Sequence, residues 1–197
     1  MGFTSKQLAD MQQRLTGGAE SKPTFIKYDG SQIVLGVDPS LRGTGYGVIN
    51  TSKSTPTTLA QGTIKCPSSW PMSRCFLEIS NTLEAIIRET NPTVAAIEGL
   101  FFAQNVKTAL VMGQARGAAL TVITKAGLDA FEIAPRKVKQ AIVGFGGAQK
   151  EAVAKMVQTR LGLSTTPSPD AADALAIALA FSQSAAAPIP DSAIKPL

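Results

Sequence analysis

Two short apolar runs in this chain each end in an acidic residue, and this pattern constrains the fold. Residues 33–37 lead into Asp38, and residues 94–97 lead into Glu98. Short apolar runs with β-branched members are typical of strands buried in a sheet. A carboxylate at the end of a buried strand costs free energy unless a ligand compensates for its lost hydration. The pattern therefore predicts an α/β fold whose strand ends carry functional groups.

A second pair of acids lies far downstream, at the start of an apolar helix. Asp170 and Asp173 are three residues apart, so their carboxylates share one helix face. Acids at two strand ends and a helix start can converge in an α/β fold. Such a cluster repels itself unless cations fill it, and hard ions such as Mg²⁺ prefer oxygen ligands. Each acid alone has an ordinary explanation, as a turn former or a favourable charge at a helix N-terminus. All four together predict a metal site.

Composition excludes several classes of protein. A chain of 197 residues, 44% apolar and 17% charged, predicts one soluble globular domain. No apolar run approaches the roughly 20 residues that span a bilayer, and the acidic residues near the N-terminus argue against a secretory signal. The chain has no histidine, which excludes a Ser-His-Asp triad and a histidine metal site. We expect a cytoplasmic protein without a membrane partner.

The net charge of +5 is concentrated in one segment. Residues 135–160 hold six basic residues and one acid, which accounts for the whole excess. A basic segment beside an acidic pocket suits a polyanion whose phosphate must reach bound metal. A solvated helix face is the alternative explanation.

Apolar periodicity predicts an alternating order of strands and helices. Strands are expected at 33–38, 45–50, 57–66, 94–98 and 128–133, and helices at 71–91, 104–125, 150–161 and from 169 through 181. We expect a domain over residues 32–184, a partly helical or flexible extension over 1–31 and a flexible tail over 185–197.

The helix expected at 104–125 is rich in small residues. Ala109, Gly113, Gly117 and Leu120 lie near one line along it. Small residues permit close helix contact, so this line is either a surface that packs on the sheet or the seam of a dimer.

Five strings of the sequence, in this order, resemble the RuvC family of Holliday-junction resolvases. They are residues 35–48 (LGVDPSLRGTGYGV), 96–102 (AIEGLFF), 113–117 (GQARG), 138–140 (VKQ) and 170–176 (DAADALA). The resemblance extends over about residues 32–181. It implies a ribonuclease H-like fold, with a five-stranded mixed sheet flanked by helices. It also implies a structure-selective endonuclease that resolves four-way DNA junctions by paired, metal-dependent phosphodiester hydrolysis in recombination and repair.

The resemblance assigns roles to the four acids and to one lysine. Asp38, Glu98, Asp170 and Asp173 would bind two Mg²⁺ ions, with Mn²⁺ expected to substitute, and Lys150 would lie beside them in the active site. The central place of Asp38 on the first strand suggests that it bridges the two ions. Some relatives have histidine where this chain has Asp173. The products would carry 5′-phosphate and 3′-hydroxyl ends.

DNA-binding roles and partners follow from the same resemblance. Phe101 would stack on a base near the junction centre, and Lys139 would support DNA binding. Weaker candidates for phosphate contacts are Arg42, Lys107, Arg116 and Arg136. Phe101 as a core residue and Lys150 as a solubilising lysine are the open alternatives. The implied partners are four-way junction DNA, a second copy of the chain and a branch-migration helicase complex.

Other classes of protein fit less well. A sugar kinase or actin-like ATPase also begins with a strand, an acid and a glycine-rich turn. Such proteins need a second glycine-rich phosphate motif and usually about twice this length. A non-catalytic junction-binding protein would have no need of all four acids. The main alternative is a different nuclease of the same superfamily, because such metal clusters do not by themselves specify the substrate.

Overall fold

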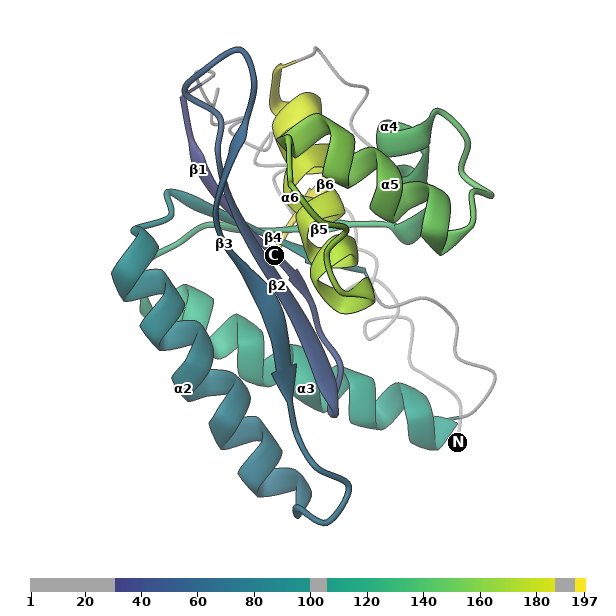
Figure 1. Ribbon diagram of the computed structural model, residues 1–197. Coiled ribbons are helices and arrows are strands. Elements are labelled where there is room, and N and C mark those ends of the chain that lie inside the picture. The colour runs from purple at the N-terminus through teal and green to yellow at the C-terminus, as the bar shows by residue number, and fades with distance from the viewer. Residues whose placement is uncertain (1–30, 100–105, 187–193) are drawn as a thin grey trace, which may run out of the picture.

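The computed structural model describes residues 31–99, 106–186 and 194–197, which form one sheet with a layer of helices on each face (Figure 1). The strands are β1 (Ile33–Asp38), β2 (Gly43–Asn50), β3 (Thr57–Lys65), β4 (Val94–Glu98), β5 (Ala130–Ile133) and β6 (Ile194–Pro196). The helices are α2 (Met72–Thr90), α3 (Val106–Lys125), α4 (Pro135–Val143), α5 (Lys150–Leu161) and α6 (Pro169–Ala186).

The sheet is mixed, in the order β3-β2-β1-β4-β5-β6. β1 runs parallel to β4, and β4 runs parallel to β5, whereas β2, β3 and β6 pair antiparallel with their neighbours. Val37 lies opposite Ile97 in the parallel pair. The next residue of each strand is therefore an acid, so Asp38 and Glu98 leave the sheet at the same edge.

Strand periodicity decides which face each side chain joins. In β1, Val34 packs in the core with α6, while Leu35 and Val37 pack in the core with α2 and α3. In β4, Ala96 packs in the core with α6, and Ile97 packs in the core with α2 and α3. Because successive side chains of a strand point to opposite faces, both terminal acids belong to the face covered by α6.

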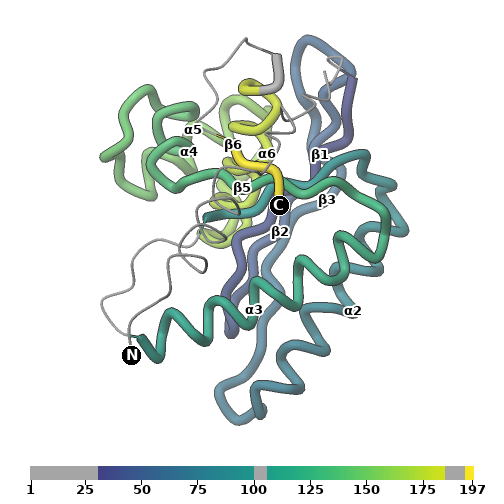
Figure 2. Tube along the Cα trace, turned by 180° about the vertical axis from the view of Figure 1, so that it is seen from behind, coloured from purple at the N-terminus to yellow at the C-terminus, as the bar shows by residue number. Residues whose placement is uncertain are grey.

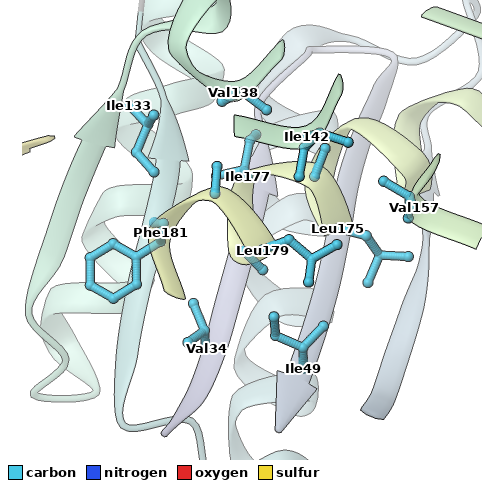
Figure 3. Packing of buried hydrophobic residues seen from close by; sticks show 14 of the residues in the cluster. Val34, Ile49, Ile133, Val138, Ile142, Val157, Leu175, Ile177, Leu179 and Phe181 are labelled. Atoms are coloured by element: carbon cyan, nitrogen blue, oxygen red, sulfur yellow. The ribbon is translucent and has the colours of Figure 1, made fainter. Parts of the chain in front are cut away.

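The two helical layers enclose separate cores. α2 and α3 cover one face of the sheet, and α6, together with α4 and α5, covers the other (Figures 1 and 2). Figure 3 shows the α6 side chains Leu175, Ile177 and Phe181 among residues of β1, β2, α4 and α5. No helix within the described ranges is long and apolar enough to cross a bilayer.

Glycines bring α6 directly onto β1 and β2. A Cβ atom added to Gly36 would lie 2.1 Å from the carbonyl oxygen of Ala174. One added to Gly45 would lie 2.0 Å from the carbonyl oxygen of Asp170. Only glycine permits so close an approach of helix and strand backbones. The start of α6 is thereby held against the sheet edge where Asp38 and Glu98 lie.

The predicted α/β fold with a mixed sheet is confirmed, with two additional elements. α4 was not predicted, although Pro135 at its start and Gly144 at its end with φ +82° are regular helix boundary signals. β6 extends the expected five strands to six by pairing antiparallel with β5, which differs from the flexible tail predicted for residues 185–197. Residues 1–30 lie outside the described part of the chain, as does Phe101.

Candidate active site

Asp38 and Glu98 form a hydrogen-bonded pair of half-buried carboxyl groups at the sheet edge. Burial, followed by the charge of Asp38 and the hydrogen bond between the two groups, raises the pKa of Glu98 to about 8. Burial also raises the pKa of Asp38, although its hydrogen bond with Glu98 opposes the change. Two carboxyl groups in contact cannot both ionise without strong repulsion. The pair therefore holds a proton near neutral pH.

Asp170 and Asp173 face this pair from the first turns of α6. A carboxylate oxygen of Asp170 lies 3.1 Å from the point where a Cβ of Gly43 would stand, so its side chain lies over the start of β2. The charges of Asp173 and Asp170 both contribute to the raised pKa of Asp38. The structure thus brings together four acids that are widely separated in the sequence.

Lys150 supplies the positive charge of the cluster. Its ammonium group donates a hydrogen bond to Asp173, with 2.6 Å between Nζ and Oδ2. The lysine side chain is 67% exposed, whereas that of Asp173 is only 19% exposed. The hydrogen bond with Asp173 raises the pKa of Lys150. Lys150 is therefore placed at the mouth of the cluster, where it can meet both an acid and an incoming anion.

The donor set of the cluster fits a hard divalent cation, because every candidate ligand is a carboxylate oxygen. Among the described residues, no group of three or more acids or cysteines forms a ready-made metal cage. The Asp38–Glu98 pair is joined by its hydrogen bond, and Asp173 is engaged by Lys150. The cluster is thus held together by a proton and an ammonium group, both of which a metal ion can replace.

The residues predicted to contact DNA differ in how exposed their side chains are and in whether they already have hydrogen-bond partners. Arg136 and Lys107 are exposed, and Lys139 on α4 is half-buried. One nitrogen of the Arg42 guanidinium donates to the carbonyl oxygens of Pro67 and Trp70, at 2.5 and 3.0 Å. Arg42 therefore braces the loop before α2 with the group that was expected to meet a phosphate.

Arg116 was predicted as a phosphate contact, but its side chain is buried. Only 7% of the residue is exposed, and it forms an ion pair with Glu132 at 2.5 Å. Glu132 was not singled out in the sequence. Its position within a predicted strand could have marked Glu132 as an acid in need of a partner. Arg116 lies on the same helix face as the apolar Ala119 and Ile123, and this spacing could have shown that the arginine points inward.

The architecture and this site can now be compared with known proteins. The model of the family described as "Crossover junction endodeoxyribonuclease RuvC" matches residues 34–181. The chain belongs to the RuvC family. The RuvC protein of Chloroflexus aggregans is 43% identical over 152 residues, which cover 77% of this chain and 93% of that protein. The Bordetella avium protein is 43% identical over 146 residues, covering 74% and 81%.

Solved structures agree with the family assignment. Thermus thermophilus RuvC in complex with a Holliday junction substrate superimposes with a TM-score of 0.75 at 32% identity, covering 84% of this chain and 99% of that one. A yeast mitochondrial Holliday junction resolvase has a TM-score of 0.57 at 12% identity, which shows a common fold. The family and ribonuclease H-like fold predicted from the sequence are confirmed. This RuvC family member is a crossover junction endodeoxyribonuclease, and the family is Mg²⁺-dependent.

The shared proton of Asp38 and Glu98 predicts how metal-free stability depends on pH. The pKa of Glu98 rises from an ordinary 4.5 to about 8 on folding, so the folded state binds this proton more tightly than the unfolded state. The resulting stabilisation is complete below pH 4.5 and is lost as the pH rises through about 8. We expect the melting temperature in EDTA to fall between these limits, measured by calorimetry.

The Asp38→Asn variant is the control for this pH dependence. It removes one ionisable group and the repulsion it exerts on Glu98, so its melting temperature should fall less over the same interval. Identical pH profiles for the wild type and the variant would show that the pair does not hold the proton.

Proposed function

We propose that Asp38, Glu98, Asp170 and Asp173 bind two Mg²⁺ ions and that the protein uses this centre to resolve four-way junctions by paired hydrolysis. The observation that carries the proposal is the convergence of the four carboxylates at one sheet edge, beneath the start of α6. An all-oxygen donor set with four negative charges balances two divalent ions. Mn²⁺ prefers similar ligands and is expected to substitute.

The chain's own residues then have distinct tasks. When bound, the ions activate the attacking water and stabilise the leaving oxygen. Asp38 is the central acid, next to Glu98 in the sheet and within electrostatic reach of both α6 acids, so it would be the residue that holds both ions. Lys150, whose ammonium group donates to Asp173 and is mostly exposed, would face the phosphate and steady the charge that develops there. The products carry 5′-phosphate and 3′-hydroxyl ends.

Junction DNA is the substrate that fits the assigned family, and the basic segment gives it a surface. Within this segment Arg136 is exposed and Lys139 is half-buried on α4, and Lys107 is exposed near the start of α3 on the other face of the sheet. We propose that these three residues contact phosphates. Phe101 lies outside the described residues, and its stacking on a base near the junction centre is part of the same proposal. Cooperation with a branch-migration helicase complex in the bacterial cytoplasm belongs to the same proposal.

Paired cleavage requires two active sites, and we assign the dimer contact to the outer face of α3. Ala115, Ala119 and Ile123 are fully buried against the sheet and Leu120 packs partly buried against the same core. Gly113 is half-buried and Gly117 is exposed, so the part of the line around these two glycines borders the outer face. Leu110, on the same helix, is 63% exposed. Figure 2 shows α3 along the outside of the sheet. A two-fold contact between α3 helices would bring two clusters to one junction.

Loss of the central ligand tests the catalytic assignment. We expect Asp38→Asn to abolish junction cleavage while junction binding is kept or tightened, because the amide is a poorer metal ligand and repels phosphate less. Cleavage of a four-way junction, matched linear duplex and single strand, with and without Mg²⁺, is the measurement. Activity above about a tenth of the wild-type value would contradict a metal-ligand role, since losing a ligand should cost several kcal/mol of transition-state stabilisation.

The dimer assignment predicts a difference between two exposed leucines. Leu110 on α3 and Leu77 on α2 are 63% and 59% exposed. Leu110→Glu should weaken the dimer and the pairing of nicks, because it places a charge in an apolar contact, while Leu77→Glu should change neither. Sedimentation and junction cleavage on the same preparations are the measurements. A dimeric Leu110→Glu protein that still makes paired nicks would remove this face of α3 from the interface.

A further inference from the structure

The buried guanidinium of Arg116 lies on the opposite face of the sheet from the carboxylate cluster. Arginine keeps its charge at any accessible pH, so its burial is costly unless partners compensate. Its Nη2 atom pairs with the Glu132 carboxylate at 2.5 Å, and its Nε atom donates to the main-chain carbonyl oxygen of Glu98 at 3.4 Å. One side chain of α3 thus joins the end of β4 to β5.

The peptide that follows Glu98 is held at both of its polar atoms. Its carbonyl oxygen accepts the hydrogen bond from Arg116, and the N–H of Gly99 donates to the carbonyl oxygen of Ile133 at 2.9 Å. β4 itself ends at Glu98. These two bonds therefore fix the direction of the backbone at the residue whose side chain enters the cluster.

Glu132 is packed closely enough to keep Arg116 in this place. A Cβ atom added to Gly99 would lie 3.1 Å from Cγ of Glu132, so the acid lies directly over the glycine. Its side chain is 30% exposed, compared with 9% for the side chain of Arg116. The glycine leaves room for the acid, and the acid holds the arginine beneath the end of β4.

We propose that Arg116 and Glu132 are positioning residues that fix Glu98 for metal binding. The inference rests on the proposed function, because it concerns one of the four acids. Neither residue touches the substrate or the metal in this account. Arg116 anchors the Glu98 main chain from the α3 face, and the alternation of the strand then directs the Glu98 carboxylate to the α6 face beside Asp38. A metal ligand that is held in advance loses less conformational freedom on binding.

The test uses the intact protein and the metal alone as its first probe. Mn²⁺ binding to DNA-free protein is measured by titration calorimetry for the wild type, Arg116→Met and Arg116→Lys. We expect Arg116→Met to weaken Mn²⁺ binding by roughly 10-fold or more, within the range seen for residues that orient metal ligands. Arg116→Lys should recover part of the loss, because one ammonium group can neutralise Glu132 but does not reproduce the fork that also reaches Glu98.

The second readout separates positioning from DNA contact. Arg116→Met should lower junction cleavage and raise the Mg²⁺ concentration needed for half-maximal cleavage, while metal-free junction binding stays within about twofold and keeps its salt dependence. A phosphate contact would instead weaken binding and reduce the salt slope by about 1. Weakened junction binding with wild-type Mn²⁺ affinity would therefore overturn the inference.

A matched control on the same helix tests for a general loss of stability. Lys125 of α3 pairs with Glu84 at 3.7 Å, and both side chains are well exposed. Lys125→Met should leave Mn²⁺ affinity, cleavage and junction binding unchanged. A lower melting temperature in Arg116→Met with wild-type Mn²⁺ affinity would make the ion pair purely structural and would also overturn the inference.

Arg116→Lys and a new variant, Glu132→Gln, keep the inference testable if Arg116→Met does not fold. Wild-type Mn²⁺ affinity in both folded Arg116→Lys and folded Glu132→Gln would overturn it.

Asp38→Asn distinguishes this inference from the proposed function. If Asp38→Asn also binds Mn²⁺ and cleaves normally, the proposed metal centre itself is wrong. If only the Arg116 and Glu132 variants behave like the wild type, the metal centre stands and the positioning role is wrong.

Discussion

The parallel pairing of β1 with β4 is the interaction on which the site depends. The register of Val37 opposite Ile97 places the two strand-terminal acids side by side. A shift of one residue in either strand would turn one carboxylate to the opposite face of the sheet, because side chains alternate along a strand. α6 then reaches the same edge because Gly36 and Gly45 allow its backbone to lie on the strands. The positions of the four carboxylates are thus determined by the pairing of β1 with β4 and by the two glycines under α6.

A proton and an ammonium group offset part of the repulsion among the four carboxylates of the cluster. Four carboxylates at one edge would repel one another if all were ionised. The hydrogen bond of Asp38 with Glu98 removes one charge at neutral pH, and the bond of Lys150 to Asp173 neutralises another. Both compensations are reversible. Under the proposed function, a divalent ion would meet carboxylates that are already gathered, and Lys150 would then be available to the phosphate.

Apolar runs were sufficient to predict β1 to β5, and the acids at two strand ends and one helix start predicted the convergence of the site. The same reasoning did not predict which way Arg116 points. Arg116 was interpreted from its positive charge alone, and its position around the axis of the helix was not used. Arg116 lies three and seven residues before the buried Ala119 and Ile123, which places it on the inner face of α3. β6 was missed for a different reason. Residues 194–196 have no apolar alternation, and the strand exists only through its pairing with β5.

The central claim is that these four acids hold the catalytic metal, and anomalous scattering from crystals grown with Mn²⁺ tests it most directly. The account predicts anomalous density between Asp38, Glu98 and the two aspartates of α6, with the bond from Lys150 to Asp173 broken. The side chain of Glu98 should turn from its hydrogen bond with Asp38 toward the ion. An active protein whose Mn²⁺ lies away from these carboxylates, with the lysine still bound to Asp173, would contradict the account.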